Sequence, residues 1–363
     1  MTAPVRHVVS VSGGKDSTAT LLLALSRVPR EQIIAIFCDT GNEIPITYDY
    51  LDELEQHLGI QIHRLKADFT QEIAAKRRFI AQDQRTRREY RTAPVFDVAG
   101  NPVPKRDGRG NILYRTVRKG RIEVREPVQK TRKVGGGRRV RWSNKGKRRA
   151  LAVLRPTGNP YLDLCLWKGR FPSRKTQFCT QELKRNLMVE FQLNLIDQGF
   201  SVVSWQGIRR DESLNRRHAK KAERIGPKLW AFRPLVEWTA QQTVDFVRSQ
   251  GCPLNPLYSL GQTRVGCVCI NSDKAGLAQI AYRFPEEIER IAEWEFLVDQ
   301  TSKRGYSTFM CDADDRQDRR AIFADLNIHA RVAWAKGGGH SLDLFAQEEL
   351  EMPACASAYG LCE

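Results

Sequence analysis

Six residues near the start of the chain have the types and spacing of a phosphate-binding turn. They follow a β-branched run that predicts a buried strand (8–11) and precede an apolar run that predicts a helix (18–25). Paired glycines let backbone N–H groups close around an anion, and a helix N-terminus adds about half a positive charge. The spacing is not that of a Walker A loop, which needs G-x-x-x-x-G-K-[ST]. The predicted phosphate site consists of Ser12, Gly13, Gly14, Lys15, Asp16 and Ser17.

Alternating strands and helices are predicted to position this turn. The apolar runs 32–38, 60–65 and 201–205 predict strands, and helical spacing of apolar residues predicts helices at 47–58 and 239–251. This alternation favours an α/β fold with a doubly wound, mainly parallel sheet. Ligands of such sheets bind at the carboxyl ends of the strands. We therefore expect a shared site for the turns that follow three strands, namely the turn at 12–17, Asp39-Thr40-Gly41 and Gly207 to Arg210.

The remaining patterns predict further elements and a division into four segments. We expect a basic-faced helix at 69–90, a hairpin within 112–124, a strand at 232–237 and a helix at 284–296. The expected segments are the first half of the nucleotide-binding domain (1–91), a partly flexible basic insertion (92–160), the second half of that domain with the Arg and Cys motifs (161–272), and a helical region with a Cys-bearing tail (273–363).

The positive charge of the chain is concentrated in one segment. The 363 residues carry a net charge of +17, and residues 105–149 contain 18 Lys and Arg against 3 Asp and Glu. Such a block is either a solvated, solubilising loop or a surface for nucleic acid phosphates, and the interleaved Tyr114 and Trp142 favour nucleic acid. We expect DNA or tRNA as the partner. No run approaches a membrane span and no signal peptide is evident, so a cytoplasmic protein without a membrane partner is expected.

Nine cysteines in such a protein indicate metal ligands, reactive thiols or core residues more than disulfides. Cys179 is predicted at the head of a helix with Lys175 and Lys184 nearby, a setting that lowers a thiol pKa and suits a metal-bound thiolate. Cys355 and Cys362 lie in the last nine residues, and we expect that tail to fold back and donate at least one thiolate.

Five motifs in order resemble those of the PAPS reductase-like superfamily of PP-loop ATP pyrophosphatases. They are the Ser-Gly-Gly-Lys-Asp-Ser turn, Asp-Thr-Gly, Gly-Ile-Arg-Arg, Asn-Pro-Leu-Tyr and Arg-Val-Gly-Cys. The chain resembles phage and bacterial members in particular, and the ATP-pyrophosphatase component of DNA phosphorothioation systems. The resemblance implies an adenine nucleotide alpha-hydrolase-like fold. It also implies nucleotide contacts from Asp39, Thr40, Gly41, Gly207, Arg209 and Arg216.

The same resemblance implies a [4Fe–4S] cluster, with four-thiolate zinc as the alternative. Its ligands would be Cys179, Cys267, Cys269 and one of Cys355 or Cys362, with Cys252 as a further candidate. Relatives have R-V-G-C-x-x-C where this chain has C-x-C, which changes the backbone torsions needed for chelation.

Three functions remain open from the sequence. The favoured one is an ATP pyrophosphatase that uses Mg²⁺ and adenylates a nucleic acid for sulfur transfer, with a cysteine desulfurase as sulfur donor. Its catalytic residues would be Lys15, Asp16, Arg209 and Arg210. The second is reduction of PAPS or APS to sulfite with a thioredoxin-type donor and Cys362 as nucleophile, although the tail lacks the family's E-C-G-[IL]-H motif. The third is a non-catalytic, ATP-regulated nucleic-acid-binding protein.

Overall fold

The computed structural model describes residues 4–119, 122–262, 264–310 and 323–337. Its chain divides into two compact units. The main unit comprises 1–77 and 149–363, and the second unit comprises 78–148. We call the second one the basic unit, because it contains 22 Lys and Arg against 6 Asp and Glu, nearly the whole net charge of the chain.

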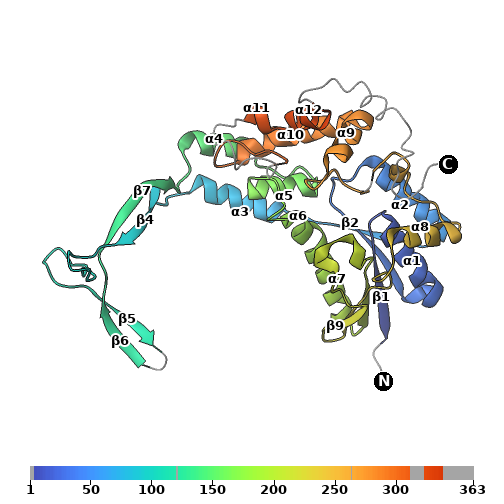
Figure 1. Ribbon diagram of the computed structural model, residues 1–363, viewed down its shortest axis with the longest axis horizontal. Helices are drawn as coiled ribbons and strands as arrows, with labels where there is room; N and C mark the ends of the chain where they lie inside the picture. Colours follow the sequence, from blue (N-terminus) through green and yellow to red (C-terminus); the bar gives the residue numbers. More distant parts are fainter. Residues whose placement is uncertain (1–3, 120–121, 263, 311–322, 338–363) are drawn as a thin grey trace. The chain divides into compact units, whose positions relative to one another are not determined.

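The main unit is built on a six-stranded, mainly parallel sheet, which confirms the α/β fold (Figure 1). The strand order is β3-β2-β1-β8-β10-β9, with only β9 antiparallel to its neighbour. The chain runs outward from β1 through β2 to β3 and then returns to the other side of β1 as β8. The strands are β1 (Val5–Val11), β2 (Ile33–Asp39), β3 (Ile62–Lys66), β8 (Ser201–Trp205), β9 (Ala222–Gly226) and β10 (Leu229–Phe232).

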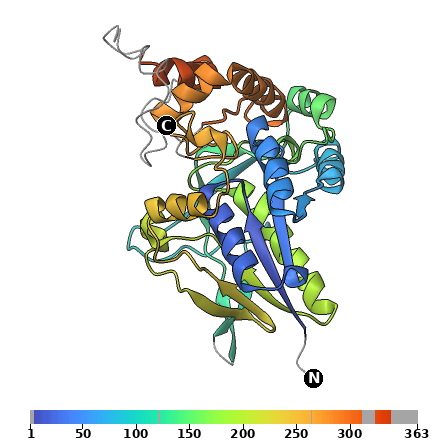
Figure 2. The same cartoon turned by 90° about the vertical axis from the view of Figure 1, so that its right-hand side faces the viewer.

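Alternate residues of these strands enter two separate cores, one on each face of the sheet. Val9 and Phe37 pack with α1 (Lys15–Arg27), α2 (Pro45–Leu58) and α8 (Ala240–Ser249). Val8 and Ile36 pack against α7 (Asn186–Asp197) on the opposite face. The sheet is thus covered on both sides, and Figures 1 and 2 show α1 and α8 side by side on one of them.

The main unit also contains a helical layer, formed by α5 between β3 and β8 and by the helices after α8. Tyr161 of α5 stacks on Trp294 of α10, with ring centroids 5.6 Å apart. Glu295 of α10 is buried and accepts hydrogen bonds from the backbone N–H groups of Phe309 and Ile328, at 2.6 and 2.9 Å. No helix among the described residues is long and apolar enough to cross a membrane. The helices of this layer are α5 (Pro160–Lys168), α9 (Lys274–Arg283), α10 (Pro285–Thr301), α11 (Phe323–Leu326) and α12 (Ile328–Ala335).

The basic unit contains two antiparallel ribbons rather than one hairpin. Strand β4 (Arg88–Pro94) pairs with β7 (Thr131–Arg139), and β5 (Tyr114–Lys119) pairs with β6 (Ile122–Pro127). Two similar turns lie between β4 and β5. In each, an Asp carboxylate accepts backbone N–H groups from the residues two and four positions on, at 2.8–3.0 Å; the turns begin at Asp97 and Asp107.

Two expected elements are wrong in part. The helix expected at 69–90 ends as α3 (Thr70–Ala81), because the Asp83 carboxylate binds the backbone N–H of Trp142 and the chain then pairs with β7. The strand expected at 232–237 lies earlier, as β10 (Leu229–Phe232), since the residues after Phe232 form turns around Pro234, which has no N–H. The remaining elements are α4 (Asn144–Val153), α6 (Phe178–Thr180), a π-helical turn (Gln181–Arg185) and four 3₁₀ turns (Arg30–Gln32, Arg210–Glu212, Leu214–Arg216 and Pro256–Tyr258).

Candidate functional site

The glycine turn joins the end of β1 to the start of α1. Ser17 closes it: its Oγ accepts the Ser12 N–H at 3.0 Å and donates to the Gly14 carbonyl at 2.8 Å. Gly13 has φ +75°, which a side chain would strain, and a Cβ there would lie 3.0 Å from Thr47. No side chain caps the start of α1. The turn therefore presents backbone donors and a helix N-terminus, the arrangement that binds phosphate.

Two side chains from the Asn-Pro-Leu-Tyr motif hold this turn from outside. The Asn255 amide donates to the Gly13 carbonyl at 3.1 Å, and the Lys15 backbone N–H donates to the Tyr258 hydroxyl at 3.0 Å. The Lys15 ammonium lies 5.5 Å from the centroid of the Tyr258 ring. Neither Asn255 nor Tyr258 was among the predicted site residues, although the motif that contains them was recognised.

Arg209 connects the β8 turn to the glycine turn. Its Nε donates to Asp16 Oδ1 at 2.6 Å, and Lys15 Nζ lies 3.7 Å from the other Asp16 oxygen. Arg209 also pairs with Asp211 and is only 4% exposed. Burial lowers the pKa of Arg209, but the neighbouring carboxylates outweigh it and the net pKa is raised. The guanidinium is therefore a fixed cation beside the phosphate-binding turn.

The backbones of the two turns lie in close contact at Gly207, the junction between them. A Cβ on Gly207 would lie 2.8 Å from the Asp16 carbonyl oxygen and 3.1 Å from Thr20 Oγ1. Since β1 and β8 are the neighbouring strands from which the chain departs in opposite directions, the junction is the topological switch point of the sheet. Open α/β sheets bind their ligands in the crevice at this point.

Arg210 and Arg216 make their contacts away from this junction. Arg210 pairs with Glu237 at 3.5 Å and donates to the Ala219 carbonyl at 3.0 Å, while Arg216 pairs with Glu212. Both arginine side chains are more than two-fifths exposed. Of the three arginines predicted as site residues, only Arg209 contacts the glycine turn within the described residues.

The Asp-Thr-Gly turn after β2 is rigid and linked to the cysteine loop. Asp39 accepts hydrogen bonds from the Gly41 N–H at 2.8 Å and the Tyr48 hydroxyl at 2.7 Å. Buried Glu43 accepts from the Thr40 N–H and hydroxyl, at 3.2 and 2.8 Å, and its backbone forms a β-bridge with Cys267. Glu43 is a site residue that the sequence did not single out. The Asp-Thr-Gly turn is thus held against the loop that carries Cys267.

Three of the predicted metal ligands come together. Burial and the neighbouring Cys269 raise the pKa of Cys179 in α6, which is opposite to the lowering expected from its helix position and the nearby lysines. The Cys267 and Cys269 thiols are hydrogen-bonded to each other. This bond lowers the pKa of Cys269 to about 6, helped by the Asn271 N–H at 3.4 Å, and raises that of Cys267. Burial lowers the pKa of Lys184, but the thiols and Glu43 raise it by more.

This cysteine group does not by itself form a metal site. Within the described parts of the chain, no three or more His, Cys, Asp or Glu side chains are placed to hold a metal ion. Cys355 and Cys362 lie outside the described residues, and Cys252 packs in the core with α1, α2 and α8. The cluster and zinc assignments therefore stay predictions, and no reaction step below depends on either.

Comparison with known proteins gives matches along most of the chain. The family model described as phosphoadenosine phosphosulfate reductase domain matches residues 6–100 and 162–272. An uncharacterized 37.8 kDa protein of Escherichia phage 186 is 37% identical over 371 residues, covering 98% of this chain and 96% of that protein. An uncharacterized protein of Methanocaldococcus jannaschii is 22% identical over 302 residues, covering 82% of this chain and 42% of that protein.

Two solved structures are similar at low identity. A phosphoadenylyl-sulfate reductase from Candida auris, in a phosphate complex, is 13% identical with a TM-score of 0.36, covering 74% of this chain and 82% of that one. A Candida glabrata FMN adenylyltransferase with FAD and pyrophosphate is 11% identical with a TM-score of 0.34, covering 72% of this chain and 55% of that one.

Proposed function

Because the chain belongs to the phosphoadenosine phosphosulfate reductase domain family, we propose that it is an ATP pyrophosphatase that adenylates a nucleic acid for sulfur transfer. ATP binding is typical of this superfamily. The observation that carries the proposal is the Arg209–Asp16 contact, which places a buried cation against the phosphate-binding turn at the sheet's switch point. In this reading the protein is related in activity to the ATP-pyrophosphatase component of DNA phosphorothioation systems.

The proposed reaction is displacement at the α-phosphorus of ATP. An oxygen of the nucleic acid forms a bond to the α-phosphorus, and the bond from that phosphorus to the bridging oxygen of the β-phosphate breaks. Pyrophosphate leaves, and the acceptor carries an adenylyl group. A persulfide on a cysteine-desulfurase-type donor then attacks the acceptor atom that carries the adenylylated oxygen, and the bond from that atom to the oxygen breaks, so that AMP leaves with the oxygen. A thiol reductant cleaves the resulting disulfide and leaves the sulfur on the acceptor.

The residues of the glycine turn and Arg209 have separate roles in this reaction. The backbone N–H groups of Gly13, Gly14, Asp16 and Ser17, at the N-terminus of α1, hold the leaving pyrophosphate, since those of Ser12 and Lys15 are bonded within the protein. Lys15 and Arg209 stabilise the negative charge that develops as the bond breaks, and Asp16 holds both cations in place. Mg²⁺ would neutralise the phosphates; it would be bound mainly by phosphate oxygens, since Asp16 already binds Arg209.

A matched pair of substitutions tests the proposal. Asp16→Asn weakens the contact that fixes Arg209, so the rate of pyrophosphate release from ATP should fall about a hundredfold. Asp49→Asn removes the same charge from an exposed position in α2 and should keep the wild-type rate. Equal rates in the two variants would refute the role of Asp16. Release of sulfite from PAPS, with no pyrophosphate from ATP, would replace the proposal with sulfonucleotide reduction.

A further inference from the structure

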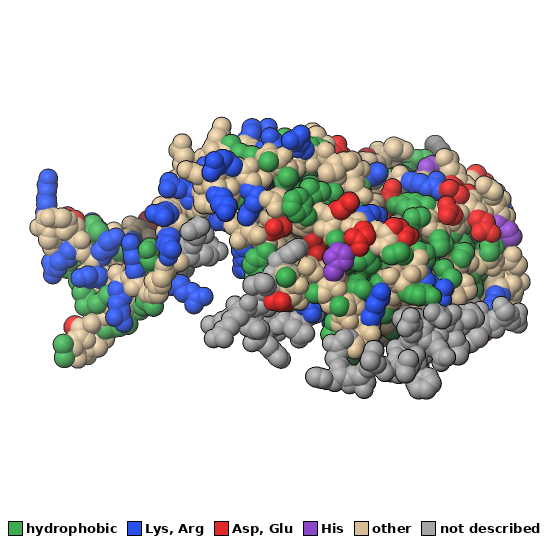
Figure 3. Space-filling model, turned by 90° about the horizontal axis from the view of Figure 1, so that it is seen from above, with side chains coloured by type: hydrophobic (Ala, Val, Ile, Leu, Met, Phe, Trp, Pro, Cys, Tyr) green, Lys and Arg blue, Asp and Glu red, His purple; other side chains and the backbone are tan. Residues whose placement is uncertain are grey.

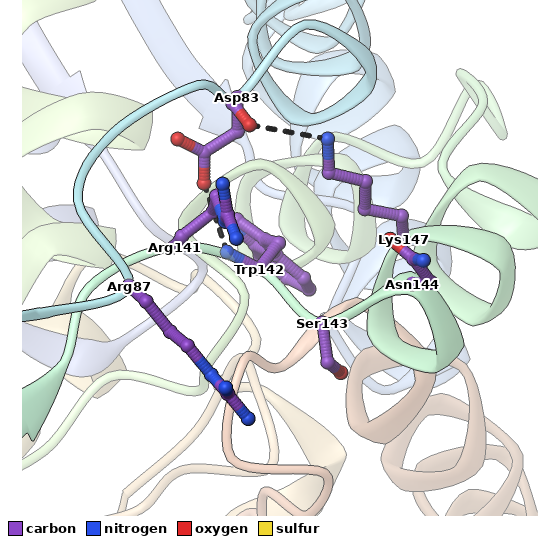
Figure 4. Close-up of a pocket in the computed structure, with 7 residues that line it drawn as sticks. All are labelled: Asp83, Arg87, Arg141, Trp142, Ser143, Asn144 and Lys147. Atoms are coloured by element: carbon purple, nitrogen blue, oxygen red, sulfur yellow. Dashed lines mark hydrogen bonds between the residues drawn. The ribbon is translucent and has the colours of Figure 1, made fainter.

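The basic unit contains an open cavity that the proposed reaction does not use. Its volume is about 410 Å³. As Figure 4 shows, the lining comes from the connection between α3 and β4 and from the segment that leads from β7 into α4. The lining residues are Asp83, Arg87, Arg141, Trp142, Ser143, Asn144 and Lys147.

A network of buried bonds gives the cavity a fixed wall. The Asp83 carboxylate, fully buried, accepts the Trp142 N–H at 2.9 Å and the Arg85 Nε at 2.9 Å. The hydrogen bonds from Arg85 lower the pKa of Asp83 well below its usual range, so this carboxylate stays ionised. Lys147 donates to the Ala81 and Asp83 carbonyls, at 3.1 and 3.3 Å. The polar groups of this wall are therefore occupied within the unit.

Unlike the bonded groups of the wall, the two arginine side chains of the lining have no partner among the described residues. Arg87 and Arg141 come from adjacent segments, since the Val140 N–H donates to the Arg87 carbonyl at 3.2 Å. Both side chains are exposed, and neither guanidinium has a hydrogen bond or an ion pair with any described residue. Helix α4 begins at the same cavity, after Ser143, whose Oγ accepts the Gly146 N–H at 3.1 Å. Two guanidiniums without a partner among the described residues and a helix N-terminus give the cavity groups that bind a phosphate-type anion.

The charge of the surrounding unit indicates a polymer rather than a small anion. Figure 3 shows Lys and Arg, in blue, spread over the visible face of this unit, at the left of the view. The unit has an excess of 16 positive charges in 71 residues, and the exposed side chains of Arg91 and Arg132 in its first ribbon make no hydrogen bond or ion pair with a described residue. A small anion would need only the cavity, whereas a row of phosphates along a strand accounts for the charge outside it.

We propose that this cavity binds a backbone phosphate of nucleic acid through Arg87 and Arg141. This inference rests on the proposed function, for which it identifies how the acceptor is held. The two contact residues lie at the same end of the first ribbon: Arg87 directly precedes β4 and Arg141 follows β7. Arg87 lies outside the basic segment 105–149.

Equilibrium binding without ATP tests this inference. The change in fluorescence anisotropy of labelled duplex DNA, single-stranded DNA and tRNA would be measured across a range of salt concentrations. Arg87→Gln and Arg141→Gln should each weaken binding about tenfold, and each should reduce the slope of log K against log salt by about one. Arg248→Gln, an exposed charge at the end of α8 in the main unit, is the matched control and should bind like the wild type.

Each outcome decides the question. The polymer whose binding shows the predicted losses is the ligand. Wild-type affinity for all polymers in both cavity variants overturns the inference, as does an equal loss in Arg248→Gln. The inference is also overturned if the two variants weaken the binding of inorganic pyrophosphate but not the binding of any nucleic acid. Arg87→Lys, which keeps the charge, should retain most of the affinity, and unfolding curves show that each variant folds.

The binding assay also separates this inference from the proposed function. If no pyrophosphate is released under any condition but the cavity variants lose affinity, only the proposed function fails. If pyrophosphate is released and the cavity variants bind nucleic acid normally, only this inference fails.

Discussion

The contact between Gly207 and the glycine turn gives the sharpest prediction, because a single methyl group tests it. Replacing Gly207 with Ala places a Cβ 2.8 Å from the Asp16 carbonyl oxygen and 2.9 Å from its carbon. Both atoms belong to the backbone, so no flexible side chain can move aside. The turn after β8 must therefore shift away from the turn after β1.

The size of the shift follows from the distance. Ordinary contact begins near 3.4 Å, so the two segments must separate by about 0.6 Å. Overpacking of this kind costs about 1–3 kcal/mol of unfolding free energy. Displacement of groups in a site by about 1 Å can cost a hundredfold in rate, so the displacement here should lower pyrophosphate release by about ten- to a hundredfold.

Steady-state pyrophosphate release and chemical unfolding would be measured for Gly207→Ala and for Gly226→Ala. Gly226 lies in β9, where an added Cβ meets only Leu229, at an ordinary 3.7 Å, and this control should behave like the wild type. If Gly207→Ala keeps both the stability and the rate of the wild type, the close junction of the two turns is refuted.

Three further predictions concern other parts of the structure. Tyr258→Phe removes the acceptor of the Lys15 N–H and should weaken ATP binding about tenfold by calorimetry; unchanged affinity would contradict the bracing role. Burial raises the pKa of Glu295 to about 7, so the folded protein favours the protonated carboxyl more than the unfolded chain does. The stability that protonated Glu295 contributes, about 3 kcal/mol of unfolding free energy, should therefore be lost as the pH rises from about 4.5 to 7. Glu295→Gln should flatten that part of the stability profile, and a profile identical to the wild type would contradict the shift. If the predicted cluster forms, Cys179→Ser and Cys267→Ser should each abolish bound iron or zinc in anaerobically purified protein, and full occupancy in either would exclude that ligand.

Much of the secondary structure of the main unit could be predicted, because each element is encoded by a pattern of neighbouring residues. The apolar strands, the glycine turn and the helix after it lie within a few residues of one another, and their pattern alone indicates a buried parallel sheet. The helix expected at 239–251 is also present, and Thr239 caps its start in a capping box with Gln242.

The contacts that complete the site could not be predicted from local pattern. Tyr258 and Asn255 reach the glycine turn across more than 240 residues of sequence, and no periodicity encodes such a contact. The end of the helix at Ala81 depends on Asp83 meeting the Trp142 N–H 59 residues later. The basic residues after Ala81 fit a helix as well as a strand, so pairing with β7 decides between them.

Identification of the products formed from ATP tests the central claim most directly. ATP labelled on the α- and γ-phosphates would be incubated with the purified protein, with and without nucleic acid. We expect labelled pyrophosphate, with the α-label on AMP or on the acceptor, and a faster reaction when nucleic acid is present. Orthophosphate as the sole product, or no reaction under any condition, would contradict the central claim.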